Sequence, residues 1–535
     1  MKHRAVKRRN VVIGIGAAAG AAAVGGITLN ANASNTRGGS TSGSSGALVF
    51  DKDDYTELTE TIADAAGKNH EVVYRFYKPR NYVANPSDDT HQSLVVSVPV
   101  KIDGKAVDAS KAPIVLANAV GAYMPSSVAK ATGVGQAQLE MTGMGAMPGG
   151  GTPSGIPSGM PNGGTGAING MVNLAKLAIA AGYVAVEPGT RGRSLTDSSG
   201  AYYGTAPAAI VDLKAAVRYI RFNKGRIPGN TDRIVSTGTS AGGAMSALLG
   251  ASGDSPLYDT YLKEAGAADA SDAIFATGAW CPIADLEHAD AAYEWNWGAN
   301  KLSTGKQVDQ TVSKELKSQF AEYQASLKLK GMKGFGNLTA RNYDEYLLKT
   351  YLQPSATKYL AALSGSDRTA YLAKNTFITW SDGKATFTWD DYLTHVGARK
   401  KTTPAFDAFD QSAGENNEFG TGTTKARHFT AYSLVNDTTG LTAKRLDSDI
   451  PELLRLMNPM YHIAQRHSNR SKHWWIRLGT SDSDTSLTVS ANLAAALDNI
   501  GDDVDHEYYW DQGHATNTDP GDFITWVAKV TGYKK

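Results

Sequence analysis

The chain has a single cysteine, Cys281, among its 535 residues. An internal disulfide is therefore excluded, and the fold must be held by packing and hydrogen bonding alone. The chain also lacks an excess of charge, with 53 Lys and Arg against 52 Asp and Glu. Because several of the basic residues precede Asn10 in a stretch without acids, the remainder is slightly acidic. This argues against a nucleic-acid partner.

The N-terminal segment has no strongly apolar run of the length that a membrane span needs. Arg8 and Arg9 precede a weakly hydrophobic stretch of Gly and Ala, and Ala31-Asn32-Ala33 follows it. This order is typical of an export signal with an A-x-A cleavage site, and the arginine pair resembles a twin-arginine signal. We therefore predict a signal peptide over residues 1–33 and an exported protein without stable membrane insertion. Ordinary secretion is the alternative route.

The sequence after the signal is typical of an α/β fold. Residues 34–46 have almost no apolar side chains and predict a flexible linker. Short apolar runs at 93–98, 113–116 and 182–186 then alternate with helical segments, the clearest of which spans 210–220. This alternation indicates a mainly parallel sheet covered on both faces.

A glycine-rich excursion separates the second and third of these apolar runs. Residues 143–166 consist mostly of Gly, Pro, Met and Ser. Such a stretch has too few core-forming side chains for a helix or strand, so we expect a surface loop.

The strand-helix alternation stops near residue 291, which predicts an inserted lid domain over 291–459. Within it, helical spacing recurs, and Asp382-Gly383 predicts the turn of a hairpin. The sheet pattern resumes at Trp474–Leu478. We therefore assign 47–290 and 460–535 to the two parts of the core.

The segment Gly238-Thr239-Ser240-Ala241-Gly242-Gly243 has the pattern of a nucleophile elbow between a strand and a helix. Glycines two residues before and after a serine allow the sharp turn that exposes its hydroxyl. A phosphate-binding loop would need a lysine, and none follows Gly243. Ser240 is therefore the candidate nucleophile.

A serine hydroxyl needs a histidine base, which in turn needs a carboxylate. In sheet hydrolases with a serine elbow, the acid follows the serine and the histidine comes last. Asp482 follows the strand that ends at Leu478, and His514 follows the strand 504–510. His506 is the alternative base and Asp484 the alternative acid.

The backbone N–H of Ala241, at the start of the helix, is a candidate oxyanion donor. Gly121, in a turn after an early strand, is the second candidate. The polar cluster Asp285–Asp290 is the one segment that suggests a metal site, and we interpret it as structural. We expect no metal and no cofactor.

Together these segments resemble the single-chain bacterial tannases, serine α/β-hydrolases that cleave galloyl esters. The resemblance covers most of the mature chain. It depends on Ala181-Gly182-Tyr183-Val184, Pro188–Arg193, the elbow, Trp280-Cys281-Pro282-Ile283, Asp285–Asp290, Tyr293-Glu294-Trp295, Asp482-Ser483-Asp484 and Gly513-His514-Ala515.

The resemblance implies an α/β-hydrolase fold with a catalytic set of Ser240, Asp482 and His514. It further implies that a lysine, a glutamate and an aspartate bind the phenolic hydroxyls of the galloyl ring, with Lys401, Glu415 and Asp484 as the matches. Lys400 and Glu418 are close alternatives. Carboxylates suit this role because they accept phenolic protons.

The sequence thus predicts an exported serine esterase for a small aromatic galloyl ester. A feruloyl or other aromatic carboxylesterase would keep the same catalytic residues. A hydrolase fold without activity, used for binding, is the alternative from another class.

Overall fold

The computed structural model describes residues 48–141 and 172–534. The predicted signal peptide, the linker and the loop 143–166 lie outside these ranges. The described residues belong to a single compact unit. None of the helices in the described part has the length and apolar character that a membrane crossing requires.

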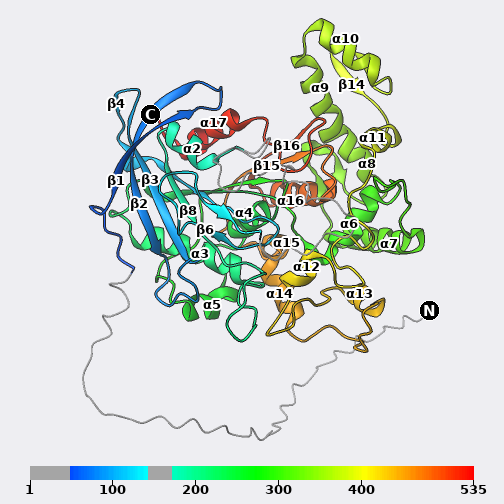
Figure 1. Ribbon diagram of the computed structural model, residues 1–535. Helices are drawn as coiled ribbons and strands as arrows, with labels where there is room; N and C mark the ends of the chain where they lie inside the picture. Colours follow the sequence, from blue (N-terminus) through cyan, green and yellow to red (C-terminus); the bar gives the residue numbers. More distant parts are fainter. Residues whose placement is uncertain (1–47, 142–171, 535) are drawn as a thin grey trace, which may run out of the picture. The chain divides into compact units, whose positions relative to one another are not determined.

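A ten-stranded sheet runs through this unit (Figure 1) in the order β1-β2-β3-β8-β5-β9-β10-β15-β16, with β4 paired to β3. The strands are β1 Thr56–Ala63, β2 Asn69–Asn81, β3 Ser93–Ile102, β4 Lys105–Ala106, β5 Pro113–Ala117, β8 Val184–Pro188, β9 Asn230–Thr239, β10 Ala276–Trp280, β15 His473–Gly479 and β16 Asp503–Tyr509. Two short strands, β6 Ser126–Ser127 and β7 Gln138–Leu139, pair separately.

The sheet is parallel from β8 to β16, as expected, but its first strands are antiparallel. In particular, β3, which we expected in the parallel part, runs antiparallel to both β2 and β8. The connections explain the first pairings: β1 and β2 are joined by residues 64–68, and β3 and β4 by Asp103-Gly104. Such short links can join only antiparallel strands.

Both faces of the sheet are buried, and neighbouring residues of a strand belong to different cores. In β3, Val95 packs in one apolar cluster, whereas Leu94 and Val96 pack in the other. Helix α2, Leu174–Ala180, contributes to the first cluster, and α3, Ala208–Phe222, contributes to the second. The expectation of a sheet covered on both sides is therefore confirmed.

The remaining core helices are α4 Ala241–Ala251, α5 Asp259–Glu264, α15 Pro459–Ala464, α16 Leu487–Asn499 and α17 Pro520–Thr531. Helix α4 follows β9 directly and packs on β9 and β10. Helices α16 and α17 follow β15 and β16, which completes the strand-helix alternation.

Between β10 and β15 the chain is mainly helical. Its elements are α6 Leu286–Trp297, α7 Gln310–Leu327, α8 Tyr343–Leu347, α9 Gln353–Ala362, α10 Gly365–Lys374, α11 Trp389–Val396, α12 Gly414–Glu418, α13 Ala431–Val435 and α14 Ile450–Met457, with the short strands β11 Lys330–Gly331, β12 Gly336–Asn337, β13 Thr379–Ser381 and β14 Lys384–Thr386. The predicted hairpin turn is present, since Asp382 and Gly383 have φ values of 53° and 72°. Helix α6 runs through the predicted boundary at 290/291, and the division into core and lid stays a prediction.

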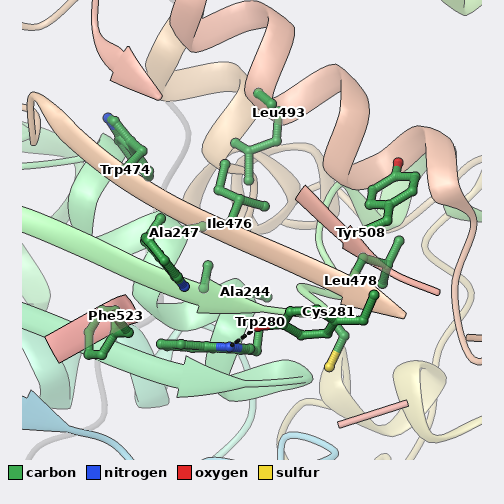
Figure 2. Packing of buried hydrophobic residues seen from close by; sticks show 14 of the residues in the cluster. Ala244, Ala247, Trp280, Cys281, Trp474, Ile476, Leu478, Leu493, Tyr508 and Phe523 are labelled. Carbon is green, nitrogen blue, oxygen red and sulfur yellow. Dashed lines mark hydrogen bonds between the residues drawn. The ribbon is translucent and has the colours of Figure 1, made fainter. Parts of the chain in front are cut away.

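Large aromatic rings pack against small residues where α4 meets the sheet (Figure 2). Trp280 of β10 contacts Phe523 of α17 with ring centroids 4.9 Å apart. A side chain at Gly250 of α4 would lie 2.9 Å from the Trp474 ring and 2.2 Å from the Thr277 hydroxyl. Because α4 offers only small residues here, the helix that begins after Ser240 approaches the sheet closely.

Replacement of Ile476, which is fully buried in β15, should test this packing. We expect Ile476→Ala to lower the free energy of unfolding by about 2–5 kcal/mol, because it removes buried methyl groups and leaves a cavity. Urea unfolding followed by tryptophan fluorescence measures the effect. Val435→Ala, at a site that is 62% exposed, is the control and should change stability by less than about 0.5 kcal/mol. Equal effects of the two changes would contradict the packing described.

Candidate active site

Ser240 lies at a sharp turn between β9 and α4, with φ 62° and ψ −125°. Side chains at the neighbouring glycines would clash with backbone oxygens: at Gly238 with Gly242 O at 2.2 Å, and at Gly243 with Trp280 O at 2.4 Å. The Ser240 N–H donates to Trp280 O over 3.0 Å. The glycines therefore permit the strained backbone that projects the serine.

A continuous hydrogen-bonded chain joins Ser240, His514 and Asp482. The His514 Nε2 atom lies 2.8 Å from Ser240 Oγ, and Nδ1 lies 2.8 Å from Asp482 Oδ2. Asp482 is fully buried. This arrangement allows the imidazole to take the serine proton while the carboxylate orients the ring and stabilises its charged form.

The loops that carry Asp482 and His514 are tied to each other by their backbones. Ser481 N–H donates to Gln512 O over 2.9 Å, and Thr480 N–H donates to Tyr509 O over 2.9 Å. The two loops follow neighbouring parallel strands, β15 and β16, so they leave the sheet at the same edge. The distance between the acid and the base is thereby fixed by main-chain contacts.

Burial alone lowers the pKa of the His514 imidazole, but the hydrogen-bonded Asp482 carboxylate, together with Cys281, outweighs burial and raises that pKa well above the ordinary histidine value. The charged ring is thus stabilised in place. This is the property that a base needs when it must hold a proton between two steps of a reaction.

The alternative bases and acids from the sequence have different surroundings in the structure. His506 is buried in β16 between the rings of Tyr351 and Tyr508, where burial holds its pKa well below the usual value. The ring of His514 is the one that reaches Ser240. Asp484 donates its backbone N–H to Asp482 over 3.0 Å and so supports the acid that contacts the base.

The turn that contains Gly121 is fastened to the elbow by Asn118. The Asn118 amide donates to Thr237 O at 2.9 Å, to Gly242 O at 3.2 Å and to the Ser246 hydroxyl at 3.0 Å. Ala241 is the first residue of α4, where backbone N–H groups have no partner within the helix. Both proposed oxyanion donors therefore belong to segments that meet at Ser240. The sequence analysis did not identify Asn118 as a site residue, although its position directly after the strand β5 could have suggested it.

The segment after α11 brings two lysines to the Asp482 loop. Lys400 Nζ lies 2.7 Å from Asp484 Oδ1, and Lys401 Nζ lies 3.6 Å from Glu415 Oε1. The Tyr293 hydroxyl connects the Asp482 loop to the lysine segment, since it donates to Ser483 O over 2.8 Å and accepts from Lys401 N–H over 3.1 Å. Lys400, Lys401, Glu415 and Asp484 thus form two ion pairs, and the first of them lies on the loop that carries Asp482.

A buried ion pair holds this lysine segment in position. Arg399 and Glu294 are both fully buried and form a two-pronged contact, with Arg399 Nη1 2.9 Å from Glu294 Oε2. Arg399 also donates to Lys401 O over 2.8 Å and to Thr402 O over 3.0 Å. The guanidinium thereby fixes the backbone that carries both lysines. No sequence pattern pointed to this pairing of residues so far apart in the chain.

The alternative glutamate, Glu418, has a different environment from Glu415. Its side chain is 1% exposed, and burial raises its pKa well above the ordinary value. Its positively charged neighbour is Arg193, whose Nε donates to Ala122 O over 2.8 Å. Lys401 therefore pairs with Glu415 and not with Glu418 among the described contacts.

The acidic cluster at the start of α6 has protein partners. Asp285 contacts His288 Nδ1 at 2.9 Å, Asn458 Nδ2 at 2.7 Å and the Tyr323 hydroxyl. Asp290 accepts the backbone N–H groups of Phe406 and Asp407, and burial with the nearby Asp407 charge raises its pKa to about 7. These carboxyl groups connect helices and loops, in line with our structural interpretation.

Comparison with known proteins places this geometry in a family. A tannin acyl hydrolase solved with 3,4-dihydroxybenzoate is 34% identical, with a TM-score of 0.75 over 91% of this chain and 99% of that one. The Lactobacillus plantarum tannin acyl hydrolase is 33% identical over 91% and 99% of the two chains, with a TM-score of 0.74. The chain belongs to the tannase family.

Other comparisons agree with this assignment. The Fusobacterium nucleatum tannase is 33% identical over 90% of this chain and 99% of that one, with a TM-score of 0.73. The family model BD-FAE matches residues 165–326, and no curated protein matches the chain. The resemblance to bacterial tannases and the α/β-hydrolase fold are confirmed, and the protein is a carboxylic ester hydrolase.

The pH dependence of ester hydrolysis should report the environment of His514. A protonated imidazole cannot accept the Ser240 proton, so kcat/KM should fall about tenfold per pH unit below the pKa of His514. Because Asp482 raises that pKa, the midpoint of the acid limb should lie above about 6.5. Steady-state rates on a simple carboxylic ester from pH 5 to 9 measure it. A midpoint well below the ordinary histidine value would contradict the electrostatics described.

Proposed function

We propose that the protein hydrolyses galloyl esters through a covalent galloyl-enzyme. The observation that carries this proposal is the hydrogen-bonded Ser240–His514–Asp482 chain, with 2.8 Å between base and nucleophile. Two of the similar tannin acyl hydrolases were solved with 3,4-dihydroxybenzoate and with ethyl gallate. Their ligands support an aromatic acid with several ring hydroxyls as the acyl group here.

In the proposed reaction, His514 takes the proton of Ser240 while the serine oxygen attacks the ester carbonyl. The backbone N–H groups of Ala241 and Gly121 stabilise the oxyanion of the tetrahedral intermediate. His514 then gives its proton to the leaving alcohol, and the ester bond breaks. Water attacks the galloyl-enzyme in the same way, with His514 as the base, and releases gallic acid and free Ser240.

We assign the ring hydroxyls to Lys401, Glu415 and Asp484. Their two carboxylates can accept phenolic protons, and the lysine can stabilise negative charge that develops on a phenol oxygen. The support is their position: Asp484 follows Asp482 by two residues, and Lys400 and Lys401 each pair with one of the two carboxylates. Lys400 contacts Asp484 and therefore stays an alternative lysine for the ring.

We also propose that the protein is exported. The support is the order of residues 1–33, with a twin-arginine-like pair, a weakly apolar stretch and an A-x-A site. Galloyl esters outside the cell would then be its substrates. Mass spectrometry of the N-terminus of protein recovered from the culture medium or the cell envelope would test the cleavage after Ala33.

Removal of the proposed nucleophile tests the mechanism. We expect Ser240→Ala to lower kcat for methyl gallate by at least about 10³-fold, because the proposed acyl-enzyme forms on the serine oxygen that this change removes. Released gallic acid is measured by chromatography. A rate equal to that of the unaltered enzyme would end the proposal, provided that the variant melts at the same temperature.

Removal of one ring contact tests the substrate class. Asp484→Asn should lower kcat/KM for methyl gallate and methyl protocatechuate by about 10–100-fold, because a hydrogen bond to a charged group is worth about 1.5–3 kcal/mol. Methyl ferulate, whose ring has fewer free hydroxyls, should be affected less. Asp390→Asn, an exposed change in α11, is the matched control. A preference of the unaltered enzyme for ferulate would favour the feruloyl esterase alternative.

A further inference from the structure

The only cysteine of the chain lies beside the residues that activate Ser240. Cys281 follows β10 and is 3% exposed. Its backbone N–H donates to Arg477 O on β15 over 2.7 Å, which brings it to the strand that leads to Asp482. One ligand atom each from Cys281, Asp482 and His514 lie within 4.8 Å of one another. In Figure 2 the sulfur marks the end of β10, at the edge of the apolar cluster.

The proposed hydrolysis makes no use of this thiol, because Ser240 is the nucleophile and Asp482 the partner of the base. A thiolate, an imidazole and a carboxylate are, however, the ligand set that Zn²⁺ and Cd²⁺ prefer in proteins. Among residues 48–141 and 172–534, this is the one group of three such residues with ligand atoms gathered this closely.

We propose that Cys281, Asp482 and His514 form an inhibitory site for a soft divalent cation such as Cd²⁺ or Zn²⁺. The cation would occupy one ring nitrogen of His514, so the ring could no longer contact both Ser240 and Asp482. Loss of either contact disables the base. The metal binding follows from the geometry alone, whereas the inhibition rests on the proposed role of His514.

The site needs only a small contraction to bind such an ion. Metal bonds of about 2.0–2.3 Å to O, N and S place the ligand atoms of a tetrahedral site about 3.3–3.8 Å apart. The present separation of up to 4.8 Å therefore has to shrink by about 1 Å. The His514 side chain is 8% exposed, so solvent reaches the ring. A water molecule would complete the fourth position.

The binding step balances without any change of oxidation state. The thiol loses its proton to solvent, and bonds form from the metal to sulfur, to one imidazole nitrogen and to one carboxylate oxygen. The proton on that nitrogen, if present, is also released. Because protons leave, the affinity should rise with pH over the range in which the thiol and the imidazole still carry protons.

Direct binding can be measured apart from catalysis in Ser240→Ala, which keeps all three ligands. The full chain with this change is titrated with Cd²⁺ by calorimetry, while the ultraviolet absorption of a cadmium–thiolate bond is recorded. Any such absorption must come from Cys281, because the chain has no other cysteine. We expect one Cd²⁺ per chain together with this absorption.

Inhibition is then compared between the unaltered enzyme and Cys281→Ser on whichever simple ester the enzyme hydrolyses. Loss of the sulfur ligand should weaken inhibition by at least about 10–100-fold, the range seen for losses at metal sites. Cys281→Ala, checked by its melting temperature, serves as a second variant if the serine form is unstable. His70→Ala removes a partly buried histidine that contacts Asp64 and Asp103, and it should leave the inhibition unchanged.

Equal inhibition of the unaltered enzyme and Cys281→Ser would overturn the proposal, as would Cd²⁺ binding without thiolate absorption. Binding with thiolate absorption but no inhibition would support the metal site and count against His514 as the base. Failure to cleave methyl gallate would count against the galloyl assignment alone, because the titration of Ser240→Ala needs no ester.

Discussion

The site depends on one buried imidazole that contacts two groups from distant parts of the chain. His514 meets Ser240, 274 residues earlier, and Asp482, 32 residues earlier. Both contacts must be present at the same time, because the imidazole accepts the Ser240 proton and the Asp482 carboxylate orients the imidazole and stabilises its charged form. The parallel strands β9, β10, β15 and β16 make this possible, since they deliver all three residues to one edge of the sheet.

The segment between β10 and β15 is held to this edge by buried polar contacts. Tyr293 joins the Asp482 loop to the lysine segment, and Arg399 fixes the backbone of that segment against Glu294. Breaking such a buried pair is expensive, because it leaves an uncompensated charge in the interior. The two ion pairs at Asp484 and Glu415 therefore stand on a segment held by buried contacts, as the proposed binding of a galloyl ring would require.

Cys281 lies at the same edge of the sheet. It lies between the strand that leads to the elbow helix and the strand that leads to Asp482, so its thiol is close to the most polar part of the core. A buried thiol normally behaves as a small apolar group. Next to an imidazole and a carboxylate, it also supplies the third ligand of the proposed metal site.

The elements with strong local patterns could be predicted from the sequence. The elbow at Ser240, the helix α3 and the strands β9, β15 and β16 each have a clear local pattern of apolar spacing and turn residues. The order Ser, Asp, His then singled out Asp482 and His514. The hairpin turn at Asp382-Gly383 was also predicted, whereas the pairing of Thr379–Ser381 with Lys384–Thr386 was not, because β propensity alone does not set register.

Other features depended on contacts between distant residues. The antiparallel direction of β3 depends on its pairing with β2 and β8, and the apolar run itself is the same for either direction. The choice of His514 over His506 depends on which ring reaches Ser240. By itself the sequence determined the candidate nucleophile and the type of sheet, because turn chemistry and hydrophobic period are local properties. Only the tertiary structure decided which carboxylates, lysines and thiol share the edge with Ser240, because that depends on how distant strands pack side by side.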